Sequence, residues 1–131
     1  MVHFTYMEQY AIQLAQLKAE LAVITDQLTP IAILDRETGD WSVRTADIDH
    51  TETDENNKAD ASEEVDERLS VLTELENRYR LILHALKKFE LGTYGICEVS
   101  GEIIEGKRLT INPAARTCTH HMENEQGLPR P

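Results

Sequence analysis

Apolar residues near the start of the chain recur at alternating spacings of three and four. This series predicts an amphipathic helix with a heptad seam, the spacing typical of helices that wrap around one another. Thr5 and Glu8 suit a capping box at its beginning, and Pro30 predicts its end. The seam comprises Met7, Tyr10, Leu14, Leu17, Leu21, Ile24 and Leu28.

A second series of apolar residues predicts a longer helix over residues 60–91. Asp60 or Ser62 suits its N-cap, and Gly92 suits the left-handed residue that closes a helix. The predicted seam comprises Val65, Leu69, Leu72, Leu75, Tyr79, Ile82, Leu86 and Phe89.

Neither helix can bury its own seam, so residues 1–92 are expected to fold as a long antiparallel α-helical hairpin, a coiled coil, in a mainly α fold. The alternative is that one or both seams pair with another chain. The connection over 29–59 carries a Gly39-Asp40 turn between two short apolar stretches, which indicates either a short ribbon or an irregular loop resting on the hairpin. Its second half is polar.

Charge is unevenly distributed over the 131 residues, whose formal net charge is −11. Residues 35–67 alone hold 13 acidic residues against three basic ones. Such a balance argues against direct binding to a nucleic-acid backbone or to an anionic membrane surface. No signal peptide or long apolar stretch is recognisable, and two cysteines do not make a secreted disulfide framework, so a cytoplasmic protein is expected.

Candidate metal ligands occur in two short pairs within a small zinc-finger-like module predicted over 93–125. Structural zinc sites use four thiolate or imidazole ligands, usually as two C-x-x-C pairs. Here the pairs are Cys97-x-x-Ser100 and Cys118-x-x-His121, so Ser100 replaces a usual ligand. Cys97, Cys118 and His121 remain, and the fourth ligand is open between His120, Glu98 and water.

The module could also hold together without a metal. In that case Cys97 and Cys118 are buried thiols or form a disulfide under oxidation. The apolar residues that would pack a metal-free module are Tyr94, Ile96, Val99, Ile103, Ile104, Leu109 and Ile111.

Residues 126–131 are rich in proline and are expected to form a disordered tail.

Residues 85–123 read ALKKFELGTYGICEVSGEIIEGKRLTINPAARTCTHHME. A helix runs into G-T-Y-G-x-C-E-x-x-G, followed by R-L, a Pro-Ala stretch and a second ligand pair. This pattern resembles the C-terminal zinc-finger segment of the DksA/TraR family of bacterial transcription regulators. The resemblance implies a cytoplasmic partner of RNA polymerase that inserts its helical hairpin into the secondary channel, commonly together with the effector ppGpp.

The family's acidic tip pattern, Asp-x-x-Asp-x-Ala, falls on residues 54–59. Asp54 and Ala59 match, whereas Asn57 replaces the second acid and keeps only its hydrogen-bonding capacity. Asp60 could supply the missing carboxylate, or it could be an ordinary N-cap. The resemblance implies contact with polymerase through protein surfaces, without sequence-specific nucleic-acid binding, and a monomer is expected.

Two other functional classes are alternatives to a transcription regulator. A coiled-coil adaptor or homodimer, with the degenerate finger as a docking module, is the alternative. A small metal-dependent enzyme is disfavoured because the sequence offers neither a nucleophile–base pair nor a phosphate-cradling glycine loop.

Overall fold

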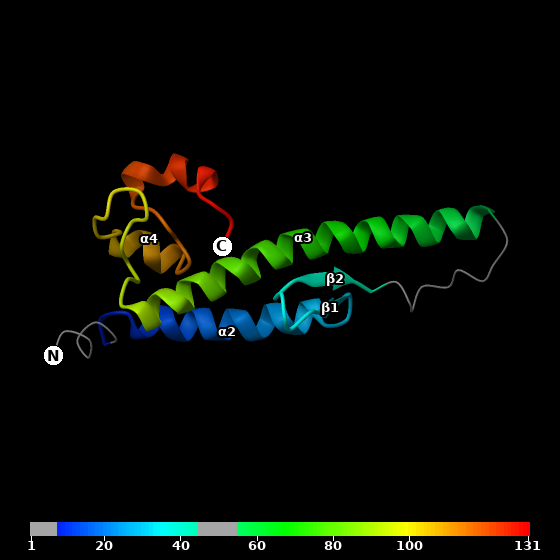
Figure 1. The fold of residues 1–131 in the computed structure, drawn as a ribbon, viewed down its shortest axis with the longest axis horizontal. Helices are drawn as coiled ribbons and strands as arrows, with labels where there is room; N and C mark the ends of the chain where they lie inside the picture. The colour runs from blue at the N-terminus through cyan, green and yellow to red at the C-terminus, as the bar shows by residue number, and fades with distance from the viewer. Residues whose placement is uncertain (1–7, 45–54) are drawn as a thin grey trace. The chain divides into compact units, whose positions relative to one another are not determined.

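The computed structural model describes residues 8–44 and 55–131, with side chains described from residue 63 onward in the second range. Figure 1 shows the order of the elements along the chain. They are α2 (Ala11–Leu28), β1 (Ala32–Leu34), β2 (Trp41–Val43), α3 (Glu55–Leu91), α4 (Gly106–Ile111) and a 3-10 helix, η1 (Thr119–Gly127).

The burial pattern of α2 confirms the predicted seam. Leu17, Ile24 and Leu28 are buried, as is Tyr10 just before the helix. Leu14 and Leu21, at the intervening seam positions, are half-buried. The helix ends at Leu28, two residues before Pro30, because proline cannot continue the backbone hydrogen bonds. Thr5 and Met7 lie outside the described residues.

Helix α3 begins five residues earlier than predicted, at Glu55. Asp60 and Ser62 therefore lie inside the helix, and the prediction that either caps it is wrong. The polar residues 55–59 belong to α3 and not to the connection. Burial follows most of the predicted seam, with Leu72, Ile82 and Phe89 buried, whereas Leu69 is 44% exposed.

The chain forms two compact units that both contain helix segments. One unit joins the N-terminal part through Ala22 to Arg80–Pro131, and the other is Val23–Tyr79. The first unit thus combines the start of α2 with the end of α3, as expected for helices that run in opposite directions. A continuous coiled coil along both helices stays a prediction.

A short β-ribbon within the second unit confirms one of the two predictions for the connection. Strands β1 and β2 pair antiparallel, with Ala32 opposite Val43 and Leu34 opposite Trp41. Gly39 supplies the positive φ of 78° in the turn between them. The ribbon packs on α3 through Trp41, whose ring meets Tyr79 edge-on at 5.6 Å and whose backbone N–H donates to Glu76 Oε2 at 3.0 Å.

An aromatic cluster joins the C-terminal module to the helices of the first unit. The rings of Phe89 and Tyr94 stack with centroids 4.0 Å apart, and Tyr10 meets Tyr94 edge-on at 5.0 Å. Tyr94 is almost fully buried, and its hydroxyl donates to the carbonyl oxygen of Pro113 at 2.6 Å. The cluster therefore ties α3 and the start of α2 to the loop that follows α4.

The predicted core of the module is only partly correct. Tyr94, Ile104 and Leu109 are buried, and Ile96 is half-buried. Val99, Ile103 and Ile111 are 42%, 69% and 86% exposed, so their assignment to the core is wrong. Such a small module has little interior, and smaller side chains fill it, namely Ala114, Ala115 and Thr117.

Residues 126–131, whose disorder stays a prediction, contact the rest of the first unit through Pro129 and Pro131. Arg116 Nη1 donates to the carbonyl oxygen of Pro129 at 2.9 Å, and Arg80 Nη1 approaches that of Pro131 at 3.5 Å. These contacts hold the segment against the rest of the first unit. Among the helices described, none is both long and apolar enough to cross a membrane.

We predict that Gly95→Ala destabilises the fold by about 3 kcal/mol. Gly95 has a φ of +83°, and an added Cβ would lie 2.5 Å from the hydroxyl oxygen of Tyr10. Left-handed backbone costs a non-glycine residue about 1 kcal/mol, and overpacking adds about 2 kcal/mol. Urea unfolding of the purified variant measures the change.

Gly92→Ala is the matched control, because Gly92 has a φ of +74° with open space around its Cα. It should lose only the backbone component, about 1 kcal/mol. Equal losses in the two variants would contradict the importance of the close approach to Tyr10.

Candidate metal centre

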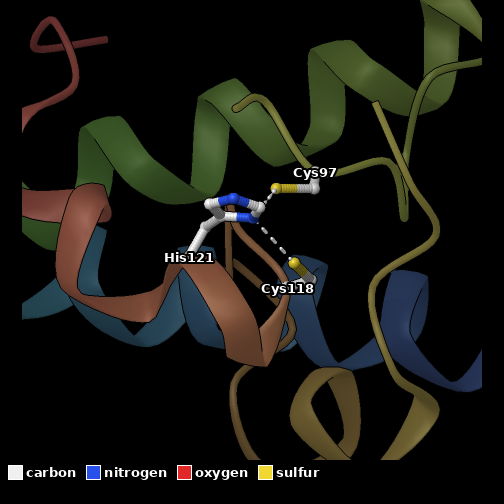
Figure 2. Close-up of side chains that lie close together, drawn as sticks. All are labelled: Cys97, Cys118 and His121. Atoms are coloured by element: carbon white, nitrogen blue, oxygen red, sulfur yellow. Dashed lines mark hydrogen bonds between the residues drawn. The ribbon is translucent and has the colours of Figure 1, made fainter. Parts of the chain in front are cut away.

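Three predicted ligands come together in the C-terminal module (Figure 2). The ligand atoms of Cys97, Cys118 and His121 all lie within 4.8 Å of one another. His121 Nδ1 is 3.9 Å from Cys97 Sγ and 3.2 Å from Cys118 Sγ. Both thiols are buried and free, so the disulfide alternative is not the arrangement seen here.

Local turns position each of the three ligands. The backbone N–H of Cys97 donates to Glu102 and its carbonyl accepts from Gly101, at 2.7 Å and 2.9 Å, which closes a tight turn. Gly101 supplies the positive φ of 76° that this turn needs. Cys118 precedes η1, and its carbonyl accepts the N–H of His121 at 3.0 Å. One helical turn therefore sets the Cys118–His121 spacing.

The surroundings of Cys97 favour its thiolate. Burial alone would raise the pKa of Cys97, but the hydroxyl of Ser100 and the backbone N–H groups of Cys118, Ser100 and Val99 outweigh it and lower the pKa to about 6. Thiolate is the form of cysteine that binds metal ions. The form of Cys97 that can bind a metal ion is thus favoured near neutral pH.

The three ligands fit a tetrahedral metal ion. With Zn–S near 2.3 Å and Zn–N near 2.0 Å, tetrahedral geometry separates sulfur and nitrogen ligands by about 3.5 Å. The two observed sulfur–nitrogen distances, 3.9 Å and 3.2 Å, lie on either side of that value. The residues present could therefore hold a metal through two thiolates and one imidazole.

None of the protein candidates for the fourth ligand joins the cluster. His120 is exposed and lies outside the group of three. Ser100 sits beside Cys97, and its Oγ accepts the N–H of Glu102 at 3.3 Å, but a neutral hydroxyl is a weak ligand for zinc. Water at the fourth position stays a prediction.

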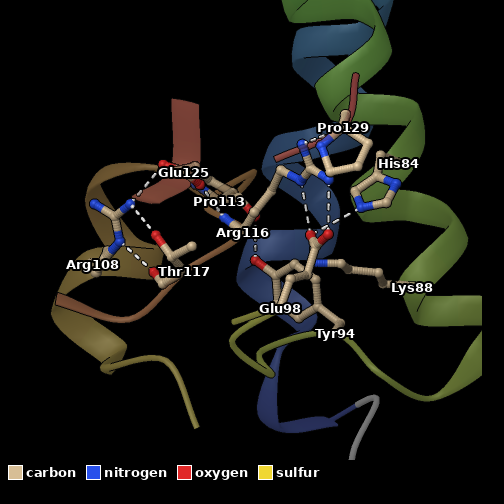
Figure 3. A network of polar contacts seen from close by, with 10 residues as sticks. All are labelled: His84, Lys88, Tyr94, Glu98, Arg108, Pro113, Arg116, Thr117, Glu125 and Pro129. Carbon is tan, nitrogen blue, oxygen red and sulfur yellow. Dashed lines mark hydrogen bonds and ion pairs between the residues drawn. The ribbon is translucent and has the colours of Figure 1, made fainter. Parts of the chain in front are cut away.

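Glu98 is not a metal ligand in this structure, because its carboxylate is engaged elsewhere (Figure 3). Arg116 contacts both of its oxygens, at 2.8 Å and 2.9 Å. Lys88 Nζ lies 2.7 Å away and His84 Nε2 3.0 Å away, both from α3. The carboxylate therefore links α3, the Cys97 turn and the segment before Cys118.

The groups around Glu98 lower its pKa. Burial would raise the pKa, but hydrogen bonds from Arg116, Lys88 and His84 outweigh it and lower the pKa from an ordinary 4.5 to about 2. Only 22% of the side chain is exposed, and Arg116 and Lys88 are more deeply buried. The carboxylate is consequently ionised throughout the physiological range.

Arg108, which the sequence pattern singled out, supports the second ligand pair. Its guanidinium donates to the carbonyl oxygen of Thr117 at 2.6 Å and pairs with Glu125 at 2.8 Å. Glu125 also accepts the backbone N–H of Arg116. These bonds hold the backbone on both sides of Cys118 and fix η1 beside it.

The predicted tip residues form no part of this centre. Asn57, Ala59 and Asp60 lie in the first two turns of α3 and belong to the other unit. Asp54 lies outside the described residues. Their predicted role stays untested by the geometry.

Comparison with known proteins gives relatives over part of the sequence. No family model matches the chain. The uncharacterized protein YteA of Bacillus subtilis (strain 168) is 39% identical over 74 residues, which cover 54% of this chain and 31% of YteA. An uncharacterized protein of Aquifex aeolicus (strain VF5) is 46% identical over 55 residues, or 40% of this chain and 38% of that protein. The chain thus matches about a third of each relative's length.

Among solved structures, the transcription factor DksA2 from Pseudomonas aeruginosa is similar to this chain. The TM-score is 0.54 at 21% sequence identity, covering 96% of this chain and 84% of DksA2. The chain therefore has a DksA-like fold, mostly helical with a small two-stranded sheet.

We predict that Ser100→Cys raises zinc affinity about 100-fold. The hydroxyl already lies beside Cys97, so a sulfur there would supply a fourth ligand. The free energy of zinc binding in small four-ligand sites is roughly 10–16 kcal/mol, so each ligand contributes about 3 kcal/mol. Competition with a chromophoric zinc chelator measures the affinity. Ser100→Ala adds no ligand and is the control; a Ser100→Cys protein that binds zinc no more tightly than Ser100→Ala would contradict this geometry.

We predict that Glu98→Gln destabilises the protein by about 3 kcal/mol at pH 7, because Arg116 and Lys88 lose a buried counter-charge. Since the pKa of Glu98 is lowered, its stabilising effect is present above about pH 4.5 and is lost as the pH falls towards 2. Unfolding curves at several pH values should therefore show wild type and variant converging in acid. Glu90→Gln, at an exposed site on α3, should change stability by less than about 0.5 kcal/mol.

Proposed function

We propose that this chain is a DksA-like transcription regulator that acts by binding RNA polymerase. The observation that carries the proposal is the fold, which resembles that of the transcription factor DksA2 over 96% of the chain. The pattern over residues 85–123 adds support, because Gly95, Gly101 and Arg108 each meet a specific backbone requirement of the module. Tyr94 does so through its bond to Pro113.

In this proposal the start of α3 is the end of the hairpin that enters the secondary channel of the polymerase. Asn57, Ala59 and Asp60 lie on its first two turns, directly after Asp54 in the sequence. Carboxylates there would approach Mg²⁺ and basic residues near the catalytic centre. Asn57 keeps a hydrogen-bonding group but lacks the charge, so the effect on transcription depends on Asp54 and Asp60.

The metal centre would have a structural role. Zinc held by Cys97, Cys118 and His121 would cross-link the two turns of the module, with water or another small ligand at the fourth position. The chain's own residues shape that site through Glu98 and Arg108. The effector ppGpp, a cytoplasmic location and a monomeric state belong to the same proposal.

We predict that the purified protein co-purifies with RNA polymerase and alters initiation in a reconstituted transcription assay. Asn57→Asp should strengthen the effect about fivefold, because it restores a carboxylate near the catalytic cations, a gain of roughly 1 kcal/mol. Asn77→Asp makes the same substitution at an exposed site later on α3 and should leave the effect unchanged.

Failure of the wild-type protein to bind polymerase would overturn the proposed function. Binding with equal effects of Asn57→Asp and Asn77→Asp would overturn the tip assignment alone. Sedimentation distinguishes the alternative class, since a stable dimer that buries the α2 and α3 seams between chains would favour an adaptor.

A further inference from the structure

The metal centre gathers two thiols and one imidazole, those of Cys97, Cys118 and His121. Their ligand atoms lie within 4.8 Å of one another, and within the described part of the chain no other His, Cys, Asp or Glu joins them. Structural zinc almost always takes four ligands at the corners of a tetrahedron. A metal ion whose coordination is complete with three ligands fits this set better than zinc does.

The ion pairs around the centre carry one excess positive charge. Lys88 and Arg116 share the carboxylate of Glu98, and Arg108 pairs with Glu125. None of these five side chains is more than 24% exposed, and Glu98 and Arg116 neighbour the two cysteines in the sequence. Two thiolates are neutralised by a divalent ion but keep one negative charge with a monovalent ion. The surrounding excess of positive charge therefore favours a monovalent ion, because a buried charge needs compensation.

The distances within the centre also admit a planar ion with three ligands. At bond lengths like those of zinc, a trigonal ion separates its sulfur and nitrogen ligands by about 3.7 Å. The observed distances from His121 Nδ1 to the two sulfur atoms, 3.9 Å and 3.2 Å, lie on either side of this value. No fourth side chain has to move for a trigonal ion to bind.

We propose that this centre binds monovalent copper, Cu(I), with three ligands and in preference to zinc. Thiolates are soft ligands that select Cu(I), and imidazole also binds copper. Cu(I) commonly completes its coordination with two or three ligands, so neither water nor the hydroxyl of Ser100 is required. Both thiols are only 1% exposed, and this burial limits the access of solvent that would promote oxidation of the ion. Copper would then connect the two turns of the module.

The test uses the full, reduced chain in the absence of oxygen, with the metal ions alone as probes. One equivalent of Cu(I), supplied from a chromophoric chelate, should displace most of the zinc from the zinc-loaded protein. X-ray absorption of the copper form should show two sulfur neighbours and one nitrogen neighbour. Because no polymerase is present, the result is independent of the proposed function.

Three variants separate the ligands from their neighbours. His121→Ala should weaken Cu(I) binding about tenfold, the equivalent of about 1.4 kcal/mol, because one of the three ligands is lost. His120→Ala removes the adjacent exposed imidazole and should change the affinity by less than about twofold. Ser100→Cys should change the Cu(I) affinity by less than about threefold, since three ligands already suffice, although it supplies a further sulfur for zinc.

The proposal is overturned if zinc stays bound when Cu(I) is supplied, or if the copper spectrum shows four neighbours or no nitrogen. It is also overturned if His121→Ala and His120→Ala bind Cu(I) equally well, or if Ser100→Cys tightens Cu(I) binding as much as zinc binding. Zinc displacement and the copper spectrum use the wild-type chain, so the test does not depend on the folding of any variant.

Discussion

The carboxylate of Glu98 is the contact on which the arrangement of the C-terminal module depends. It joins Lys88 of α3 to Arg116, and the backbone N–H of Glu98 also donates to the carbonyl of Arg116 at 2.9 Å. Glu98 directly follows Cys97, and Arg116 precedes Cys118 by two residues. The ion pair therefore joins the two backbone segments that carry the thiols. A metal would then bind to a site already shaped by the chain, at a lower cost in conformational entropy.

Periodicity predicted the helices because burial selects one face of each. Leu17 and Ile82 are fully buried at seam positions that could be read from apolar spacing alone. The start of α3 could not be found in this way, since residues 55–59 are polar and carry no periodic signal. Asp60 suited an N-cap by residue type, but capping is a local preference of about 1 kcal/mol, and a helix that can extend past it will do so.

The candidate ligands could be predicted because both pairs are short-range. One turn joins Cys118 to His121, and a tight turn joins Cys97 to Ser100, so sequence spacing nearly determines each half of the site. The role of Glu98 depends on partners 10 to 18 positions away, and no local pattern specifies them. The exposure of Ile111 likewise depends on how little interior the folded module has.

The partners of Glu98 also decide whether its carboxylate could serve the metal centre. Arg116, Lys88 and His84 share one carboxylate, that of Glu98. Had Glu98 turned towards the metal as a fourth ligand, Arg116 and Lys88 would lie buried without a counter-charge, which is far costlier than an open coordination position. The ion pairs of Glu98 with Arg116 and Lys88 therefore disfavour its use as a fourth metal ligand.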